Sequence, residues 1–262
     1  MEHIVILTGA GISAESGMGT FRDKDGLWTK VNLEDVATPE GFSRNPEMVH
    51  DFYNQRRAGC RTAEANDAHR ALARLEREYS GRVTLITQNV DNLHEAGGST
   101  DVVHMHGELL KALCSACGHQ WAWPGDMGLT DACAACASIG TVRPDVVWFG
   151  EMPYHLERIA MAVETATLFV AIGTSGNVYP AAGYVSEARM RGIPTLEINL
   201  ERSDASRLFD HHITGLATET VQPGRFTGQV IRDGERIVYA SMPATKKWLV
   251  DNKWQAAQPF AI

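Results

Sequence analysis

The chain has 262 residues, of which 44% are hydrophobic and 21% are charged. This length and apolar content suit one large domain, or a domain that contains an inserted module. A formal net charge of −8 argues against a nucleic-acid partner, and no apolar stretch reaches the roughly 18 residues that a membrane span needs. The N-terminus, MEHIVIL, lacks the features of a signal peptide. We therefore expect a cytoplasmic enzyme whose partners are small molecules or peptides.

Short apolar segments alternate with helical patterns along the chain. Strand character is found in residues 4–7, 83–87, 102–104, 146–149, 168–172 and 195–199, and helical spacing in residues 68–79 and 181–191. Such alternation predicts an α/β fold, with a Rossmann-like parallel sheet and helices on both of its faces.

Two stretches interrupt this alternation and predict a second, smaller domain. Residues 30–67 are charged with helical spacing, and residues 108–143 contain four paired cysteines. The Rossmann-like part then comprises about 1–29, 68–107 and 144–222. Residues 223–262 differ in character: alternating residues around Asp233-Gly234 predict a hairpin, and residues 244–254 predict a short helix.

The four paired cysteines have the spacing of a zinc ribbon. Cys114 and Cys117 form one C-x-x-C pair, and Cys133 and Cys136 form the other after 15 intervening residues. Four thiolates complete a tetrahedron and leave no open position for water, so we expect one structural zinc ion.

A glycine-rich bend follows the first apolar segment. Residues 9–14, GAGISA, fit the loose G-x-G-x-x-G/A pattern of dinucleotide-binding folds and point to NAD. A standard Rossmann unit would continue as a helix and a second strand. Here the polar stretch TFRDKDGLW, residues 20–28, follows instead.

Polar groups follow four more of the expected strands. These are TQNVDNLH at 87–94, HMHGE at 104–108, GTSG at 173–176 and NLE at 199–201. Open α/β sheets bind ligands at the carboxyl ends of their strands, so these groups are expected to meet in one site. A histidine there, such as His106, can act as a general base.

Together these motifs resemble the sirtuins, the NAD-dependent protein lysine deacylases. GAGISAESG, TFRDKDGLW, TQNVDNLH, HMHGE, the two cysteine pairs, VVWFGEMP, AIGTSGNVYPA and INLE occur in the family's order across residues 1–222. The resemblance implies that His106 is the general base and acts with Asn89 and Asp91 on an acyl-lysine protein or peptide. It also implies that NAD is contacted by Gly9, Ala10, Gly11, Ala14, Thr20, Phe21, Arg22, Gln88, Asn89, Asp91, Gly173, Thr174, Ser175, Asn199, Leu200, Glu201 and Ala217.

The segment DFYNQRR, residues 51–57, is similar to the bacterial CobB-like, class III subgroup of that family. Tyr53 and Arg56 are three residues apart, so on a helix they share a face and can enter one pocket. A phenol beside a guanidinium suits a carboxylate, which favours succinyl- or malonyl-lysine. The remaining substrate contacts implied by the resemblance are Val147, Phe149 and Gly150.

Two other functions use the same features. A mono-ADP-ribosyltransferase would bind NAD in the same pocket and transfer ADP-ribose to a protein side chain. A noncatalytic NAD sensor or zinc-ribbon interaction protein is the alternative outside enzymes, although Asn89, Asp91 and His106 together disfavour it. The oligomeric state is left open by the sequence.

Overall fold

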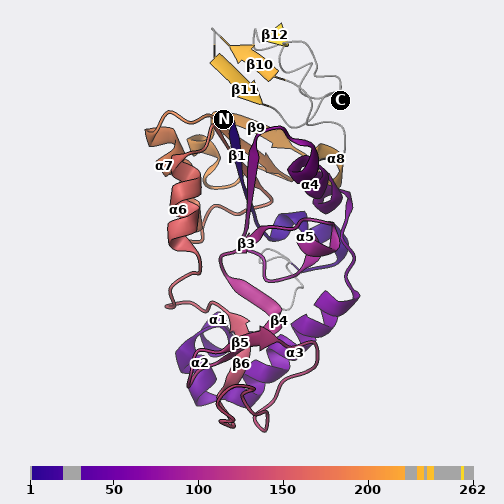
Figure 1. The fold of residues 1–262 in the computed structure, drawn as a ribbon, viewed down its shortest axis with the longest axis vertical. Helices are drawn as coiled ribbons and strands as arrows, with labels where there is room; N and C mark the ends of the chain where they lie inside the picture. Colours follow the sequence, from indigo (N-terminus) through magenta and orange to yellow (C-terminus); the bar gives the residue numbers. More distant parts are fainter. Residues whose placement is uncertain (1, 20–30, 222–228, 233–234, 239–254, 257–262) are drawn as a thin grey trace.

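The central sheet of the computed structural model is parallel and six-stranded, in the order β3-β2-β1-β7-β8-β9 (Figure 1). The residues that the structure describes are 2–19, 31–221, 229–232, 235–238 and 255–256. The strands are β1 His3–Thr8, β2 Arg82–Thr87, β3 Val102–His104, β7 Leu168–Ile172, β8 Thr195–Asn199 and β9 His211–Thr214. The predicted Rossmann-like sheet is therefore confirmed, and the strand order reverses direction between β1 and β7.

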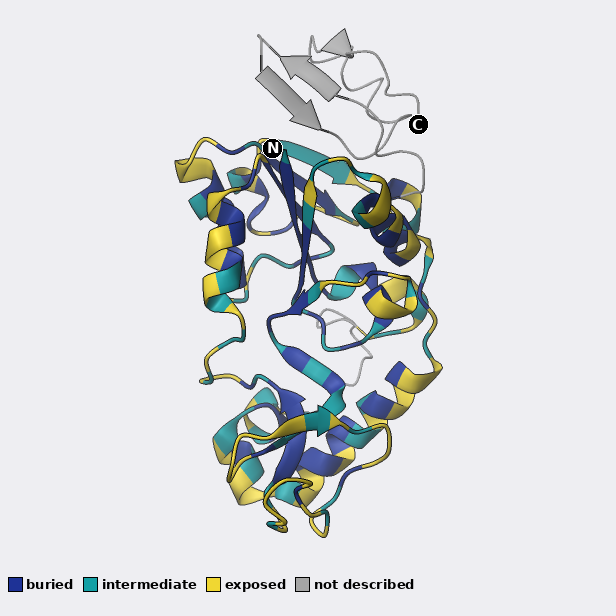
Figure 2. Cartoon of the chain, in the orientation of Figure 1, coloured by how far each residue is buried: buried dark blue, intermediate teal, exposed yellow. Residues whose placement is uncertain are grey.

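Strand β1 is buried on both faces because helices cover both sides of the sheet. Figure 2 shows β1 in the dark blue of buried residues. Val5 and Leu7 pack into the apolar cluster on one side, and Ile4 and Ile6 into the cluster on the other. This burial explains the continuous apolar run at the start of the chain, which is typical of parallel sheets. The covering helices are α6 Leu156–Glu164 and α7 Tyr184–Met190 on the first side, and α4 Asp67–Glu78 and α8 Ala217–Thr220 on the second.

The smaller domain combines three helices with a three-stranded antiparallel sheet, β5-β4-β6 (Figure 1). The helices are α1 Leu33–Val36, α2 Pro39–Arg44 and α3 Pro46–Thr62, and the strands are β4 Gly107–Cys114, β5 Gln120–Ala122 and β6 Val142–Val146. Helix α3 begins where the Asn45 side chain accepts a hydrogen bond from the Met48 amide. Helices and sheet share one apolar cluster that includes Phe52, Leu109 and Trp148.

The expected strand at residues 146–149 is wrong. Val146 ends β6, which pairs with β4 in the small sheet rather than with the parallel sheet. Beyond it, the Val147 amide donates to the His106 carbonyl and the Phe149 amide donates to the Ala37 carbonyl. These two amides are therefore not available to pair with a strand of the parallel sheet.

Several other elements differ from the expectations. Helix 181–191 is divided into a 3₁₀ turn, η4 Ala181–Gly183, and α7. Helix α6 and strand β9 were not expected. The remaining elements near the sheet are η1 Ala10–Ile12, η2 Ala14–Ser16, α5 Leu93–Ala96 and η5 Ser206–Leu208.

The last described segments form a separate antiparallel sheet, β11-β10-β12. Its strands are β10 Gln229–Arg232, β11 Glu235–Val238 and β12 Gln255–Ala256. Strands β10 and β11 pair on either side of Asp233-Gly234, whereas the predicted helix at 244–254 lies outside the described residues. None of the helices in the described ranges is both long and apolar enough to cross a membrane.

Candidate active site

One cavity of about 450 Å³ is lined by both the parallel sheet and the smaller domain. The sheet contributes the loops that follow its strands, as expected for the carboxyl edge of an open α/β sheet. The predicted residues that line it are Gly9, Ala10, Gly11, Ala14, Tyr53, Arg56, Gln88, Asn89, Asp91, His106, Val147, Phe149, Gly150, Gly173, Thr174, Ser175, Asn199, Leu200, Glu201 and Ala217. Thr20, Phe21 and Arg22 lie outside the described residues.

The glycine-rich bend after β1 crosses the bend after β7 in direct backbone contact. The Gly11 amide donates to the Gly173 carbonyl at 2.8 Å, and a Cβ on Gly11 would lie 2.7 Å from the Gly173 Cα. Gly173 has φ +62°, and a Cβ there would approach the Ile12 nitrogen to 2.5 Å. Only glycine therefore fits at these two positions. The first bend continues as the two 3₁₀ turns η1 and η2.

Three loops at the sheet edge are tied together through Thr174. The Gln88 side-chain amide donates to the Thr174 hydroxyl at 2.9 Å, and the Asn199 side-chain amide donates to the Thr174 carbonyl at 2.7 Å. Gln88 and Thr174 follow β2 and β7, and Asn199 is the last residue of β8. Their hydrogen bonds fix the relative positions of the polar groups along this side of the cavity.

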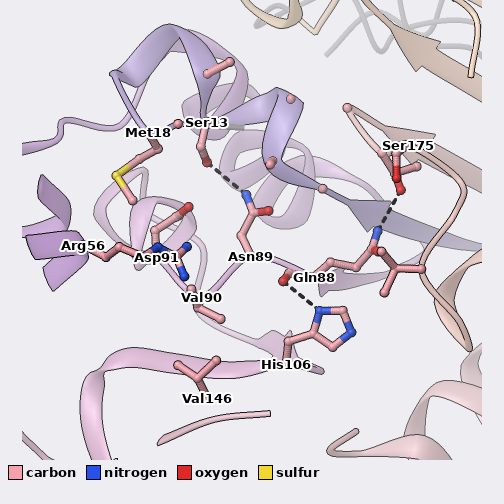
Figure 3. Close-up of a pocket in the computed structure, with 18 of the residues that line it drawn as sticks. Ser13, Met18, Arg56, Gln88, Asn89, Val90, Asp91, His106, Val146 and Ser175 are labelled. Atoms are coloured by element: carbon pink, nitrogen blue, oxygen red, sulfur yellow. Dashed lines mark hydrogen bonds between the residues drawn. The ribbon is translucent and has the colours of Figure 1, made fainter. Parts of the chain in front are cut away.

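Asn89 and Asp91 are joined to the glycine-rich bend by Ser13, a residue that sequence reasoning did not select. The Asn89 side-chain amide donates to the Ser13 hydroxyl at 3.0 Å (Figure 3). The same hydroxyl lies 3.3 Å from Nε2 of His69, and its proximity lowers the pKa of the Asp91 carboxyl. Because the His69 Nδ1 accepts from the Asn66 amide, its Nε2 carries the proton and donates to Ser13.

Burial raises the pKa of the Asp91 carboxyl, which is only 5% exposed. The Leu93 amide at 3.1 Å, the Ser13 hydroxyl and the positive charge of Arg56 act in the opposite direction. Figure 3 shows Arg56 reaching from α3 to the side of Asp91. The carboxyl group is therefore held in place by donors on several sides.

His106 is oriented by one backbone hydrogen bond. Its Nδ1 lies 3.0 Å from the Gln88 carbonyl oxygen, which can only accept, so Nδ1 carries the proton and Nε2 has a free lone pair (Figure 3). Burial lowers the pKa of the imidazole, and the Gln88 carbonyl opposes this effect. The ring is thus neutral near pH 7 and able to accept a proton at Nε2.

Tyr53 and Arg56 line the smaller domain's side of the cavity from consecutive turns of α3. The Tyr53 side chain is 1% exposed, and burial raises the pKa of its phenol, which therefore stays protonated. The Arg56 guanidinium lies 5.9 Å from the Tyr53 ring centroid. Both residues thus line one cavity from the same helix.

The four cysteines of the smaller domain form one cluster away from the cavity, and none of them lines it. The sulfurs of Cys114 and Cys136 are 3.8 Å apart, and those of Cys117 and Cys133 are 3.7 Å apart. A zinc ion with bonds of about 2.3 Å to sulfur has a tetrahedral edge of about 3.8 Å, so the cluster fits one zinc ion. No position of that tetrahedron is left for a reacting water.

Some lining residues carried no clear signal in the sequence. Ser13 and Trp148 lie inside the quoted motifs GAGISAESG and VVWFGEMP, but serine and tryptophan there have no spacing that marks a role. The lining residues that were not predicted are Ser13, Glu15, Met18, Gly19, Ala37, Val90, Val146, Trp148, Glu151, Pro153, Val178, Tyr179, Ile198, Gly215 and Leu216.

A parallel sheet whose glycine-rich bend and oriented histidine share one cavity with a four-cysteine domain defines a nucleotide-binding α/β protein with an inserted metal module. The model of the Sir2 family matches residues 9–180. The chain therefore belongs to the Sir2 family, the sirtuins, and it resembles NAD-dependent protein deacylases over 83% of its length.

Two of these relatives are each more than half identical to the chain. The "NAD-dependent protein deacylase" of Caulobacter vibrioides is 55% identical over 221 residues, which are 83% of this chain and 93% of the relative. The "NAD-dependent protein deacylase SIR2rp3" of Leishmania major is 54% identical over 223 residues, which are 83% and 92% of the two chains.

Solved structures show the same fold. A Sir2 homologue in complex with NAD has a TM-score of 0.76 and 40% identity, with 83% of this chain and 85% of that chain covered. A Sir2 variant with a deacetylated p53 peptide and 3′-O-acetyl-ADP-ribose has a TM-score of 0.73 and 28% identity, with 82% and 89% covered.

Proposed function

We propose that the protein removes acyl groups from lysine side chains of proteins, with NAD as co-substrate, and that succinyl and malonyl groups are among its substrates. The products are nicotinamide, free lysine and an O-acyl-ADP-ribose. The observation that carries this proposal is the shared cavity, in which His106, the glycine-rich bend and the Tyr53–Arg56 pair all take part. A general base, a dinucleotide site and a carboxylate-binding pair are the three parts that such a reaction needs.

In the proposed reaction His106 accepts a proton at Nε2 from a ribose hydroxyl of NAD. The Gln88 carbonyl supports this step because it holds the proton of the neutral ring at Nδ1. Before this step, the acyl oxygen attacks the ribose carbon that carries nicotinamide, and nicotinamide leaves. The deprotonated ribose oxygen then adds to the acyl carbon, and water completes the release of free lysine and O-acyl-ADP-ribose. A general base contributes roughly 10²–10⁴-fold to such steps.

The loops of the parallel sheet bind NAD in this proposal. Asn89 and Asp91, with Gln88, hold the nicotinamide and its ribose. The hydrogen bond from Asn89 to Ser13 and the one from the Leu93 amide to Asp91 support this assignment because they fix the two side chains. The phosphates and the adenosine half lie against the loops after β7 and β8. The residues assigned to that half are Gly173, Thr174, Ser175, Asn199, Leu200 and Glu201.

The acyl-lysine enters between the sheet and the smaller domain. Residues 147–150, which include the proposed contacts Val147, Phe149 and Gly150, offer a partly exposed edge for a substrate backbone; Phe149 is 49% exposed. Tyr53 and Arg56 then meet the end of the acyl chain. A carboxylate there accepts hydrogen bonds from both, which an acetyl group cannot do.

Turnover of matched peptides tests the proposal. Acetyl-, succinyl- and malonyl-lysine versions of one peptide are incubated with the protein, with and without NAD, and lysine and nicotinamide release are measured by mass spectrometry. We expect free lysine only when NAD is present. Nicotinamide release with the peptide still acylated and ADP-ribose on protein would support a mono-ADP-ribosyltransferase instead.

A further inference from the structure

Trp148 lines the same cavity as the proposed acyl-binding pair and contacts Tyr53 directly. We propose that Trp148 is a positioning residue that favours carboxylated acyl groups by directing the Tyr53 hydroxyl hydrogen into the cavity. This inference rests on the proposed deacylase function and adds to it a residue that acts through Tyr53.

The contact is a hydrogen bond inside the apolar core of the smaller domain. The indole Nε1 of Trp148 donates to the Tyr53 hydroxyl oxygen at 2.9 Å, although the two residues are 95 positions apart in the chain. Tyr53 is 1% exposed and Trp148 is 2% exposed. Solvent does not compete for the bond, so it orients the phenol strongly.

The direction of the Tyr53 hydrogen follows from the donors around it. An indole N–H can only donate, and the guanidinium of Arg56 can only donate. Neither neighbour can accept the Tyr53 hydrogen, so this hydrogen is directed to an acceptor in the cavity. The hydrogen bond that Tyr53 accepts also polarises its O–H and makes it a better donor. A carboxylate is the acceptor that matches a donor hydroxyl beside a positive charge.

The indole itself is held rigidly on several sides. The Arg143 guanidinium stacks on the Trp148 ring, 3.7 Å from its centroid. Glu151 accepts two hydrogen bonds from that guanidinium, at 2.7 and 2.8 Å, and a third from the Trp148 backbone amide at 2.8 Å. The Phe42 ring packs 5.3 Å from the indole. The position of the indole nitrogen, and with it the Tyr53 hydroxyl, is therefore fixed before any substrate enters.

A double-mutant cycle measures this role. Trp148→Phe, Tyr53→Phe and the double variant are compared with the unsubstituted protein on succinyl-lysine and butyryl-lysine peptides, which differ in a carboxylate or a methyl at the chain end. We expect Trp148→Phe to lower the succinyl-to-butyryl ratio of kcat/KM roughly fivefold, as the loss of one hydrogen bond does, mainly through a higher KM for succinyl peptide. In the Tyr53→Phe background the same substitution should leave the ratio within twofold.

Trp123→Phe is the matched control. Trp123 also donates its indole N–H, to the Asp126 carbonyl at 2.9 Å, but it does not line the cavity. Its substitution should leave the succinyl-to-butyryl ratio unchanged. If Trp148→Phe does not fold, replacement of Trp148 by benzothienylalanine removes the N–H while it keeps the size of the ring.

The outcomes separate this inference from the proposed function. An unsubstituted protein that releases no lysine from either peptide overturns the proposed function, and one that releases lysine without any preference for succinyl over butyryl overturns only the role of Trp148. If that preference exists but Trp148→Phe retains it, or lowers it equally with and without the Tyr53 hydroxyl, only the role of Trp148 is overturned. A loss that depends on the Tyr53 hydroxyl supports it.

Discussion

Replacement of Arg56 by methionine tests the carboxylate-binding pair most directly. Methionine keeps much of the side-chain length but removes the positive charge and all five N–H donors. Because Arg56 is only partly exposed, its hydrogen bonds to a carboxylate would be sheltered from water. Hydrogen bonds to charged groups contribute about 1.5–3 kcal/mol, and about 2 kcal/mol corresponds to a roughly 30-fold change in kcat/KM. We expect this loss on succinyl peptide, relative to acetyl peptide.

The assay is lysine release from matched succinyl and acetyl peptides under kcat/KM conditions. Arg61→Met serves as the control because Arg61 is on the same helix but pairs with Asp126 at 3.2 Å, outside the cavity. It should leave the succinyl-to-acetyl ratio unchanged. Equal losses on both peptides with Arg56→Met would refute the reasoning, since they would show that Arg56 does not distinguish the carboxylate.

Three further predictions concern the base and the metal. His106→Ala should lower turnover roughly 10²–10⁴-fold, while the melting temperature stays unchanged. A near-native rate of the variant would show that His106 is not the general base. Burial lowers the pKa of His106, so the ring becomes protonated only below about pH 6.5. We therefore expect kcat/KM to fall only below that pH. A pH–rate profile in which kcat/KM already falls at higher pH on the acidic side would contradict the assignment. Elemental analysis should find one zinc ion per chain. Cys133→Ser should remove the zinc and lower the melting temperature by about 10 °C or more. A metal-free protein with an unchanged melting temperature would exclude a structural role for zinc.

The parallel sheet could be predicted because most of its strands have a local residue pattern that is typical of a strand. Leu168–Ile172 is a continuous apolar run between Thr167 and Gly173, and Thr195–Asn199 alternates polar and apolar residues after Pro194; the structure has both strands with these bounds. Strand β9, with sequence HHIT, contains no such run and is an edge strand with half-exposed residues. Its pairing with β8 depends on tertiary contacts that the local sequence does not encode.

Residues 146–149 show the opposite failure, since their sequence is apolar but their backbone is not in the parallel sheet. The pattern VVWF fits a strand, yet the amides of Val147 and Phe149 bond to loops in two different parts of the chain. The contact of Trp148 with Tyr53 likewise depends on residues that are distant in the sequence. Only the packing of the smaller domain brings these two side chains together, so no spacing in the sequence could indicate it.

The glycine-rich bends and helix α3 form two parts of the cavity wall that respond differently to mutation. The part formed by the glycine-rich bends is shaped by main-chain atoms in contact, and any added carbon there meets another backbone. The part on α3 is shaped by side chains, Tyr53 and Arg56, one helical turn apart. Under the proposed function, substitution of a few side chains on α3 would therefore change the acyl preference while the backbone of the glycine-rich bends keeps its form.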